Sequence, residues 1–249
     1  MPKKAPYGVF FWNTTDNEII RSFGYNPDSF IKEMSVCTNR RLVLTVNESH
    51  NLRVYGFKQA KDIVKEGIVI LFSLDLFVTV SDMTACMSSN GDSLVISSFT
   101  NKNDIGINKL EVVGLFSDDQ ERRTIEEYRS EHPFTKLWID KPFSKILCSM
   151  NDGTFCLFKK NRECKTFCIY KSSPKDPLFW TVSPDSNYVF VVYKEQKIAA
   201  YCMITHKIIS IYQGGIEELN DLVFSKHYAM FITAGDRLTW WLPNNWLDN

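Results

Sequence analysis

A recurring unit constrains the fold of this chain more than any other feature. Five stretches each run from an apolar strand through a polar turn into a second apolar strand, and their turns are marked by Thr38, Ser88, Asp140, Ser183 and Ser225. By subtraction of residue numbers, successive markers are 50, 52, 43 and 42 residues apart. Repeats of roughly 40–45 residues built from short strands are typical of the blades of a β-propeller. Because helical periodicity is nearly absent, we predict an all-β fold.

The residues around these turns resemble the WD40-repeat family. Val182-Ser-Pro-Asp185 precedes an apolar strand and then a polar turn, as in the second half of a WD40 repeat, and Leu222-Val-Phe-Ser225 has the same setting. Trp12-Asn13, Tyr55-Gly56 and Trp241-Leu242 stand where that family has its Trp-Asp pair, although the chain has no true Trp-Asp pair. The resemblance covers most of the chain and implies a divergent WD40-like propeller.

The two ends of the chain predict incomplete blades. We expect one domain over residues 1–249, with about five to six four-stranded blades. Val9 to Phe23 reads as the third and fourth strands of a blade, and Leu222 to Leu242 supplies three strands. If Glu18 to Phe23 takes the fourth place in the last blade, the termini share a blade and the ring closes. An open propeller completed by a partner is the alternative, and it would expose an apolar blade face.

A charged insertion at about residues 117–132 interrupts the repeats. We expect it to form a solvated loop or a short helix capped by Ser117, because acidic residues follow that serine. The alternative is a docking element for a basic partner, since the stretch has a formal charge of −3. The candidate partner-binding residues in it are Asp118, Asp119, Glu121, Arg122, Arg123, Glu126 and Glu127.

The C-terminal residues hold the densest aromatic cluster. Trp240 and Trp241 are neighbours in a predicted strand, so they should face opposite sides of the sheet, one in the core and one against the adjoining blade. Trp246 and Leu247 lie beyond Pro243 and are further candidates for partner binding. The alternative for these two residues is that they hold the tail to the propeller.

No pattern in the sequence predicts catalysis, a cofactor or a metal site. The four histidines fall in separate turns, and the spacing of Cys148, Cys156, Cys164 and Cys168 differs from that of zinc knuckles. These cysteines sit in apolar runs, so we expect buried thiols. The chain also lacks a glycine-rich phosphate loop and a Gly-x-Ser-x-Gly elbow. We therefore expect no catalytic, cofactor-binding or metal-binding residues.

The balance of charge and the cysteine count limit the partners and the compartment. Lysine plus arginine equals aspartate plus glutamate at 29 each, so a nucleic acid is not expected as a direct ligand. The seven cysteines are an odd number, which favours reduced thiols in the cytoplasm or nucleus. No apolar run is long enough to span a bilayer, so we expect no membrane insertion.

These features predict a non-catalytic scaffold or adaptor subunit whose partners are other proteins in an intracellular complex. Propellers suit this role because their rims are built from variable turns on a rigid frame. Two alternatives remain. One is a small-ligand or catalytic site in the central channel, made by charged side chains from three or more blades. The other is a non-catalytic partner of an RNA-modifying or chromatin enzyme.

Overall fold

The chain folds entirely into antiparallel sheets in the part that the computed structural model describes. The described residues are 8–13, 18–24, 30–37, 39–57, 68–75, 80–102, 105–116, 122–140, 144–150, 152–159, 164–168, 177–193, 197–213, 219–225 and 230–242. They form two compact units: residues 1–148 with 158–163, and residues 149–157 with 164–249. Among these residues there is no helix with the length and apolarity that crossing a lipid bilayer requires.

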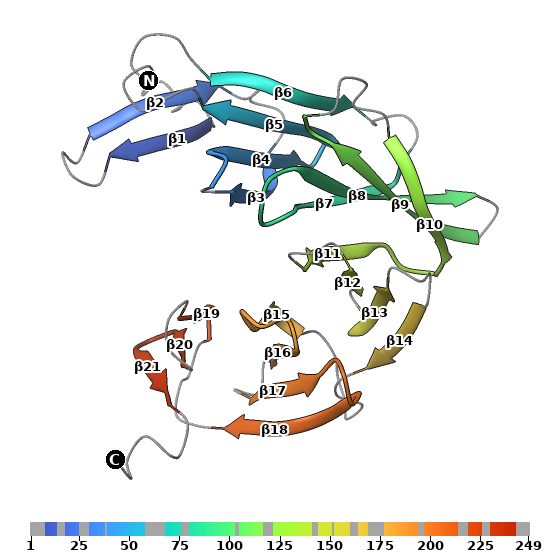
Figure 1. The fold of residues 1–249 in the computed structure, drawn as a ribbon, viewed down its shortest axis with the longest axis vertical. Helices are drawn as coiled ribbons and strands as arrows, with labels where there is room; N and C mark the ends of the chain where they lie inside the picture. The colour runs from blue at the N-terminus through green and yellow to red at the C-terminus, as the bar shows by residue number, and fades with distance from the viewer. Residues whose placement is uncertain are drawn as a thin grey trace, which may run out of the picture. The chain divides into compact units, whose positions relative to one another are not determined.

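The first part of the chain forms a two-stranded sheet and two four-stranded sheets (Figure 1). The two-stranded sheet pairs β1 (Gly8–Asn13) with β2 (Glu18–Gly24). Blade 1 contains, in order, β3 (Ile31–Cys37), β4 (Leu42–Asn47), β5 (Asn51–Phe57) and β6 (Ile68–Asp75). Blade 2 contains β7 (Asp82–Met87), β8 (Ser93–Lys102), β9 (Ile105–Gly114) and β10 (Arg122–Arg129).

The remaining strands form two further four-stranded sheets and one three-stranded sheet. Blade 3 contains β11 (Phe134–Ile139), β12 (Lys145–Met150), β13 (Thr154–Lys159) and β14 (Cys164–Cys168). Blade 4 contains β15 (Pro177–Val182), β16 (Tyr188–Tyr193), β17 (Lys197–Cys202) and β18 (Lys207–Gln213). Blade 5 contains β19 (Asp221–Phe224), β20 (Phe231–Ala234) and β21 (Leu238–Trp241). In every blade the described strands follow one another in chain order, as expected of consecutive antiparallel strands.

The markers read from the sequence occupy the same turn in successive blades. At Ser88, Asp140, Ser183 and Ser225, the backbone N–H donates to the carbonyl oxygen five residues later, at distances of 2.9, 3.2, 2.9 and 3.1 Å. Each turn links the first strand of its blade to the second. Side chains reinforce three of the turns: Ser88 Oγ and Ser183 Oγ accept from the backbone N–H at the far end, as does Asp140 Oδ1. Thr38 lies outside the described residues.

The blades pack face to face because their middle strands are apolar on both sides. The strand β4 is buried along its whole length, and so are the four central residues of β16. Within the first unit, β7 lies beside both β3 and β11, and within the second, β15 lies beside β19. First strands that neighbour one another from blade to blade are the arrangement of a β-propeller, so the predicted fold class is confirmed.

The predicted blade count of five to six agrees with four four-stranded blades, one three-stranded blade and the β1–β2 pair. The strands predicted near both ends are present among the described residues, where β1 pairs with β2 and blade 5 has three strands. In the described hydrogen-bond pattern, β2 pairs with β1 and belongs to a sheet separate from blade 5. The sharing of a blade between the termini therefore stays a prediction, as does a single domain over residues 1–249.

The expectation of a loop or helix for the charged insertion was wrong for residues 122–129, which form the strand β10. This strand pairs with β9 along its length, from Arg122 opposite Val113 to Arg129 opposite Ile107. Pairing with an existing strand overrides local helical preference, and the outer strand of a blade tolerates charges because it borders water. Ser117, the proposed cap, lies outside the described residues.

Candidate interaction surfaces

The predicted partner-binding residues of the insertion lie on the outer strand of blade 2, as far as they are described. Arg122, Arg123 and Glu127 are exposed on β10, and Glu126 is half-buried. The register places Glu127 opposite Lys109 of β9, so one of the acidic residues faces a cation across the strands. The other predicted residues, Asp118, Asp119, Glu121, Trp246 and Leu247, lie outside the described residues.

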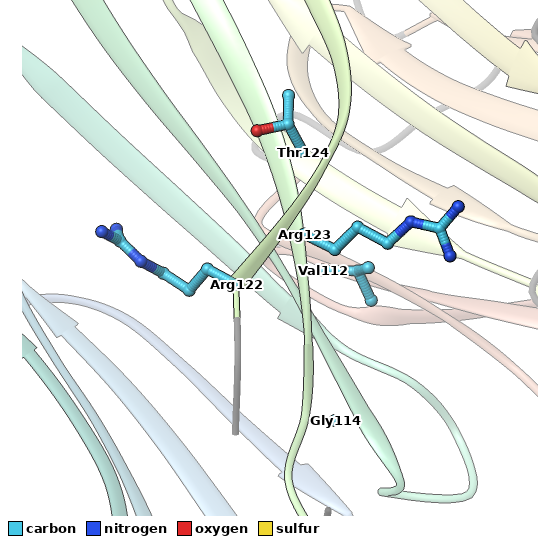
Figure 2. A pocket seen from close by; sticks show the side chains of 5 residues that line it. All are labelled: Val112, Gly114, Arg122, Arg123 and Thr124. Atoms are coloured by element: carbon cyan, nitrogen blue, oxygen red, sulfur yellow. The ribbon is translucent and has the colours of Figure 1, made fainter. Parts of the chain in front are cut away.

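A shallow depression on blade 2 includes two of these arginines. It is lined by Val112, Gly114, Arg122, Arg123 and Thr124 (Figure 2). The two guanidinium groups point away from each other, because neighbouring residues of a strand face opposite sides of the sheet. The depression therefore does not direct both cations at one anion.

A buried carboxylate engages the first of these arginines. The Glu111 side chain is only 5% exposed, and its Oε2 lies 3.5 Å from Arg122 Nη1. Its Oε1 lies 3.0 Å from Lys109 Nζ. A carboxylate that loses its water needs such cations to stay ionised in the fold. Arg122 therefore has a structural role in blade 2, whereas no ion pair engages Arg123 in the part of the chain that the structure describes.

A second polar cluster joins blades 1 and 2 at their first strands and the turns that follow. Lys32 Nζ lies 2.5 Å from Asp82 Oδ1, and Arg40 Nη2 lies 2.5 Å from Asp92 Oδ1. Arg40 also covers the ring of Phe116, with its guanidinium carbon 5.0 Å from the ring centroid. The two ion pairs link residues about fifty positions apart in the sequence, so they hold the two blades in register.

Glu33 is the most perturbed carboxyl in this cluster. Burial raises its pKa above the ordinary value, because the ionised form loses hydration, and a hydrogen bond from Thr84 opposes the rise. Thr84 Oγ1 donates to Glu33 Oε2 at 2.8 Å, and the Ala85 N–H lies 3.4 Å from the same oxygen. The other oxygen, Oε1, is buried without a hydrogen-bond partner among the described residues. Between the two blades, one oxygen of the Glu33 carboxyl group therefore accepts hydrogen bonds while the other has no partner among the described residues.

Burial of the cysteines was predicted correctly for four of the five whose side chains are described. Cys37, Cys148, Cys156 and Cys202 are buried thiols, and Cys86 is a half-buried thiol. Burial raises the pKa of the Cys86 thiol to about 12, so it stays protonated and is a poor nucleophile at neutral pH. No three His, Cys, Asp or Glu side chains gather as a metal site within the described ranges. The absence of cofactor and metal sites from the whole chain stays a prediction.

The clearest exposed apolar surface lies on blade 5. Val223, Leu238, Trp240 and Leu242 have exposed fractions of 56, 65, 58 and 49%. The register brings them to one face, because Val223 pairs with Ile232 and Ile232 pairs with Trp240. We call this surface the blade 5 face; it comprises Val223, Ile232, Leu238, Trp240 and Leu242.

The neighbouring tryptophan points the other way. Trp241 stacks on Phe231, with ring centroids 5.6 Å apart, and its Nε1 donates to Thr233 Oγ1 at 3.0 Å. Opposite faces for Trp240 and Trp241 are thus confirmed. The expectation that the second tryptophan packs against an adjoining blade was wrong, since Trp240 is 58% exposed. The alternation of a strand showed that the two side chains diverge, but it did not show which face lacks a neighbour.

Sequence reasoning missed a second apolar surface, on the outer strand of blade 4. Ile208, Ile209 and Ile211 of β18 are exposed. The order of the strands could have indicated this exposure, because the fourth strand of a blade forms its outer edge. An apolar run in that position has no further strand to cover it within the blade.

Comparison with known proteins supports the fold and leaves the family open. The sequence matches no known protein-family profile, and no curated protein matches it. The structure is similar to the crystal structure of Raptor from Chaetomium thermophilum, with a TM-score of 0.71 and 11% sequence identity. The match covers 94% of this chain and 21% of the Raptor chain. This chain therefore spans about a fifth of the length of that protein, and the likeness concerns the fold alone.

Proposed function

We propose that this chain is a divergent WD40-like propeller that acts without catalysis, as an interaction scaffold or adaptor subunit of a multiprotein complex. The complex would lie in the cytoplasm or nucleus. The observation that carries this proposal is the blade 5 face, an apolar surface centred on an exposed tryptophan. Contiguous exposed apolar surfaces mark sites where proteins associate.

The surroundings of Trp240 favour a protein partner. Tryptophan, together with tyrosine and arginine, dominates the binding energy of protein interfaces. Here the exposed ring of Trp240 is carried by a strand whose other face is fixed by Trp241. Binding would therefore cost little conformational entropy of the backbone, because the strand is already ordered. Asp236 and Arg237 are exposed in the turn before β21 and supply charges beside the apolar residues. An apolar centre with charged neighbours is the usual composition of such interfaces.

The test is a comparison of the proteins that bind to the full chain in its own cells. Tagged wild-type protein and Trp240→Ser are purified, and the co-purifying proteins are measured by quantitative mass spectrometry. We expect the main partners to fall on the order of tenfold or more in the variant, because a central tryptophan is a typical hot spot.

Ile105→Ser is the matched control, since Ile105 lies on blade 2 with an exposed fraction of 51%. It should retain the partners. Both variants should keep the melting temperature of the wild type, because both side chains are exposed. Equal recovery of partners by Trp240→Ser and the wild type would contradict the role of the blade 5 face. A lone monomer that turns over a small substrate would contradict the scaffold function itself.

A further inference from the structure

The outer edge of blade 4 has the features of a strand-pairing site. In the described part of the chain, β18 pairs with β17 alone, from Lys207 opposite Cys202 to Gln213 opposite Lys197. In an antiparallel pair, alternate residues direct their N–H and C=O groups away from the partner strand. The free side of β18 therefore presents a row of backbone groups to a further strand.

The side chains on this edge are apolar. Ile208, Ile209 and Ile211 have exposed fractions of 40, 53 and 49%. An irregularity in the register places Ile208 opposite Tyr201 and Ser210 opposite Ala200, so Ile209 is an extra residue in β18. This extra residue shifts the alternation by one, and Ile208 consequently shares a face with Ile211.

The opposite face of β18 fixes the strand in this orientation. Tyr212 contacts the aromatic core of blades 4 and 5, with ring centroids 5.4 Å from Phe231 and 5.5 Å from Trp241. It also stacks on Phe190 at 6.2 Å. Because the tyrosine is held there, the isoleucines do not turn inward without breaking these ring contacts.

The bulge at Ile209 is one device that limits edge pairing, but the edge lacks a second device, a series of charged side chains. Natural edge strands carry charges that discourage pairing with other chains. The outer strand β10 of blade 2 follows this rule, since five of its eight residues are charged. In β18 the one charged residue is Lys207, at the start of the strand.

We propose that the β18 edge pairs with the β18 edge of a second copy of this chain, antiparallel and about a two-fold axis near Ile211. Such an interface uses the same surface on both subunits, so that surface has to be complementary to itself. Here the two Ile211 side chains would lie side by side, and Ser210 would lie opposite Tyr212. The two Lys207 residues would remain at opposite ends of the paired stretch, so no like charges meet.

The overall charge also permits this pairing. The chain has a formal net charge of zero, so two copies do not repel each other at long range. The pairing would join two blade 4 sheets into one continuous sheet. Each dimer would then carry two blade 5 faces, and this bivalency is the one part of the inference that rests on the proposed function.

The test is the mass of the full chain in solution as a function of its concentration. Sedimentation velocity and light scattering should show a monomer that becomes a dimer as the concentration rises. Ile211→Lys places two lysines at the axis, and we expect it to weaken dimerisation on the order of tenfold or more. Ile70→Lys is the matched control, because Ile70 is 50% exposed on β6, the outer strand of blade 1. It should dimerise like the wild type.

Disulfide cross-linking tests the geometry. Ile211→Cys should form an intermolecular disulfide under mild oxidation, because the two copies meet at this residue, whereas Ile70→Cys should not. A wild type that stays monomeric at all concentrations would overturn the proposal, as would a dimer that Ile211→Lys does not weaken. A monomer that binds a synthetic peptide with the sequence of residues 207–213 would also overturn it, because the edge would then accept a free strand rather than a second copy.

These results are independent of the scaffold function. Loss of the blade 5 partners in Trp240→Ser with an intact dimer would support the scaffold and the dimer separately. A monomer that still recovers those partners would remove the dimer and leave the scaffold in place.

Discussion

Neighbouring blades are joined by different chemistry in the two units of this protein. Blades 1 and 2 share a core that is mainly aliphatic, with residues such as Leu44, Val54 and Ile96. Polar contacts border that core, including the Glu33–Thr84 hydrogen bond. Blades 4 and 5 share a core in which aromatic rings predominate. It comprises Phe190, Phe231 and several aliphatic residues, with Phe179, Tyr188, Tyr212, Phe224 and Trp241 packed against it.

The difference shows that one architecture accepts two kinds of contact between blades. The two kinds should differ in how strongly their stability depends on pH and salt. Aromatic rings bury a large apolar area and carry no charge that titrates near neutral pH, so the contact between blades 4 and 5 should respond little to pH or salt. A buried carboxyl loses or gains a proton as the pH changes, so the contact between blades 1 and 2 should respond to both. Four predictions test this contrast, from the largest expected effect to the smallest.

The largest effect should come from Phe231→Ala in the aromatic core. Phe231 is 5% exposed, and its ring centroid lies within 5.2 to 5.8 Å of those of Phe190, Tyr212, Phe224 and Trp241. Removing it leaves a cavity, so we expect the free energy of unfolding to fall by about 3–5 kcal/mol, measured by urea denaturation. Phe231→Leu should lose clearly less. A loss for Phe231→Ala that changes strongly between acid and neutral pH would contradict the contrast.

The next effect concerns two threonines, one in each unit: Thr84 donates to Glu33 of the neighbouring blade, and Thr233 accepts from Trp241 within blade 5. Thr84→Val removes the donor to Glu33, and we expect a loss of about 1–3 kcal/mol at neutral pH that shrinks in acid, when the carboxyl is protonated. Thr233→Val removes the acceptor for Trp241 Nε1, and its loss of about 1 kcal/mol should not vary with pH. Urea denaturation at several pH values distinguishes the two. If the stability losses of Thr84→Val and Thr233→Val depended on pH in the same way, the proposed contrast between the two units would be wrong.

Glu33→Gln should stabilise the protein slightly at neutral pH, because a neutral amide avoids the loss of hydration that the ionised carboxylate suffers on burial. The pKa of Glu33 is raised above its ordinary 4.5 in the folded state, so the Glu33 carboxylate binds a proton more tightly in the folded protein than in the unfolded chain. The wild type therefore loses stability as the pH rises from 4.5 through the folded pKa, and the glutamine variant does not. The difference between the two unfolding free energies should be small below pH 4.5 and constant well above the folded pKa. An equal or larger advantage of the variant in acid would contradict this assignment.

The smallest effect should come from the ion pairs at the border of blades 1 and 2. Lys32→Met and Arg40→Gln each remove one partner of a pair whose side chains are a quarter to a half exposed. We expect losses of less than about 1 kcal/mol that diminish at high salt, because water and ions screen such pairs. Thermal unfolding at low and high salt measures both. A large loss that salt does not change would show that these pairs act as buried contacts.

Much of the fold could be predicted from the sequence because each blade is built from local interactions. The turns at Ser88 and Ser183 close through backbone hydrogen bonds to the residue five positions later, and the Oγ of each serine accepts a second bond from the N–H of that residue. Such a turn needs only a few suitable residues in order, so it recurs visibly along the chain. The three strands of blade 5 and the β1–β2 hairpin were predictable for the same reason.

The candidate surfaces were less predictable, because they depend on what lies beside each strand. The charged residues Arg122 and Glu127 were singled out correctly as polar and accessible, but their strand was expected to be a loop or helix. The exposed residues Ile209 and Ile211 were not singled out as a surface. Hydrophobicity indicates that a residue gains free energy from burial, and it does not say whether a neighbour is present to bury it.

The amino-acid order alone determined the repeating β-units and their turns, because these features arise from hydrogen bonds between residues close in the chain. Only the tertiary structure decided that Glu33 meets Thr84, fifty-one residues away, and that Trp241 is enclosed while Trp240 is exposed. Contacts between blades depend on how whole sheets stack, and that stacking is the sum of many weak interactions with no local signature.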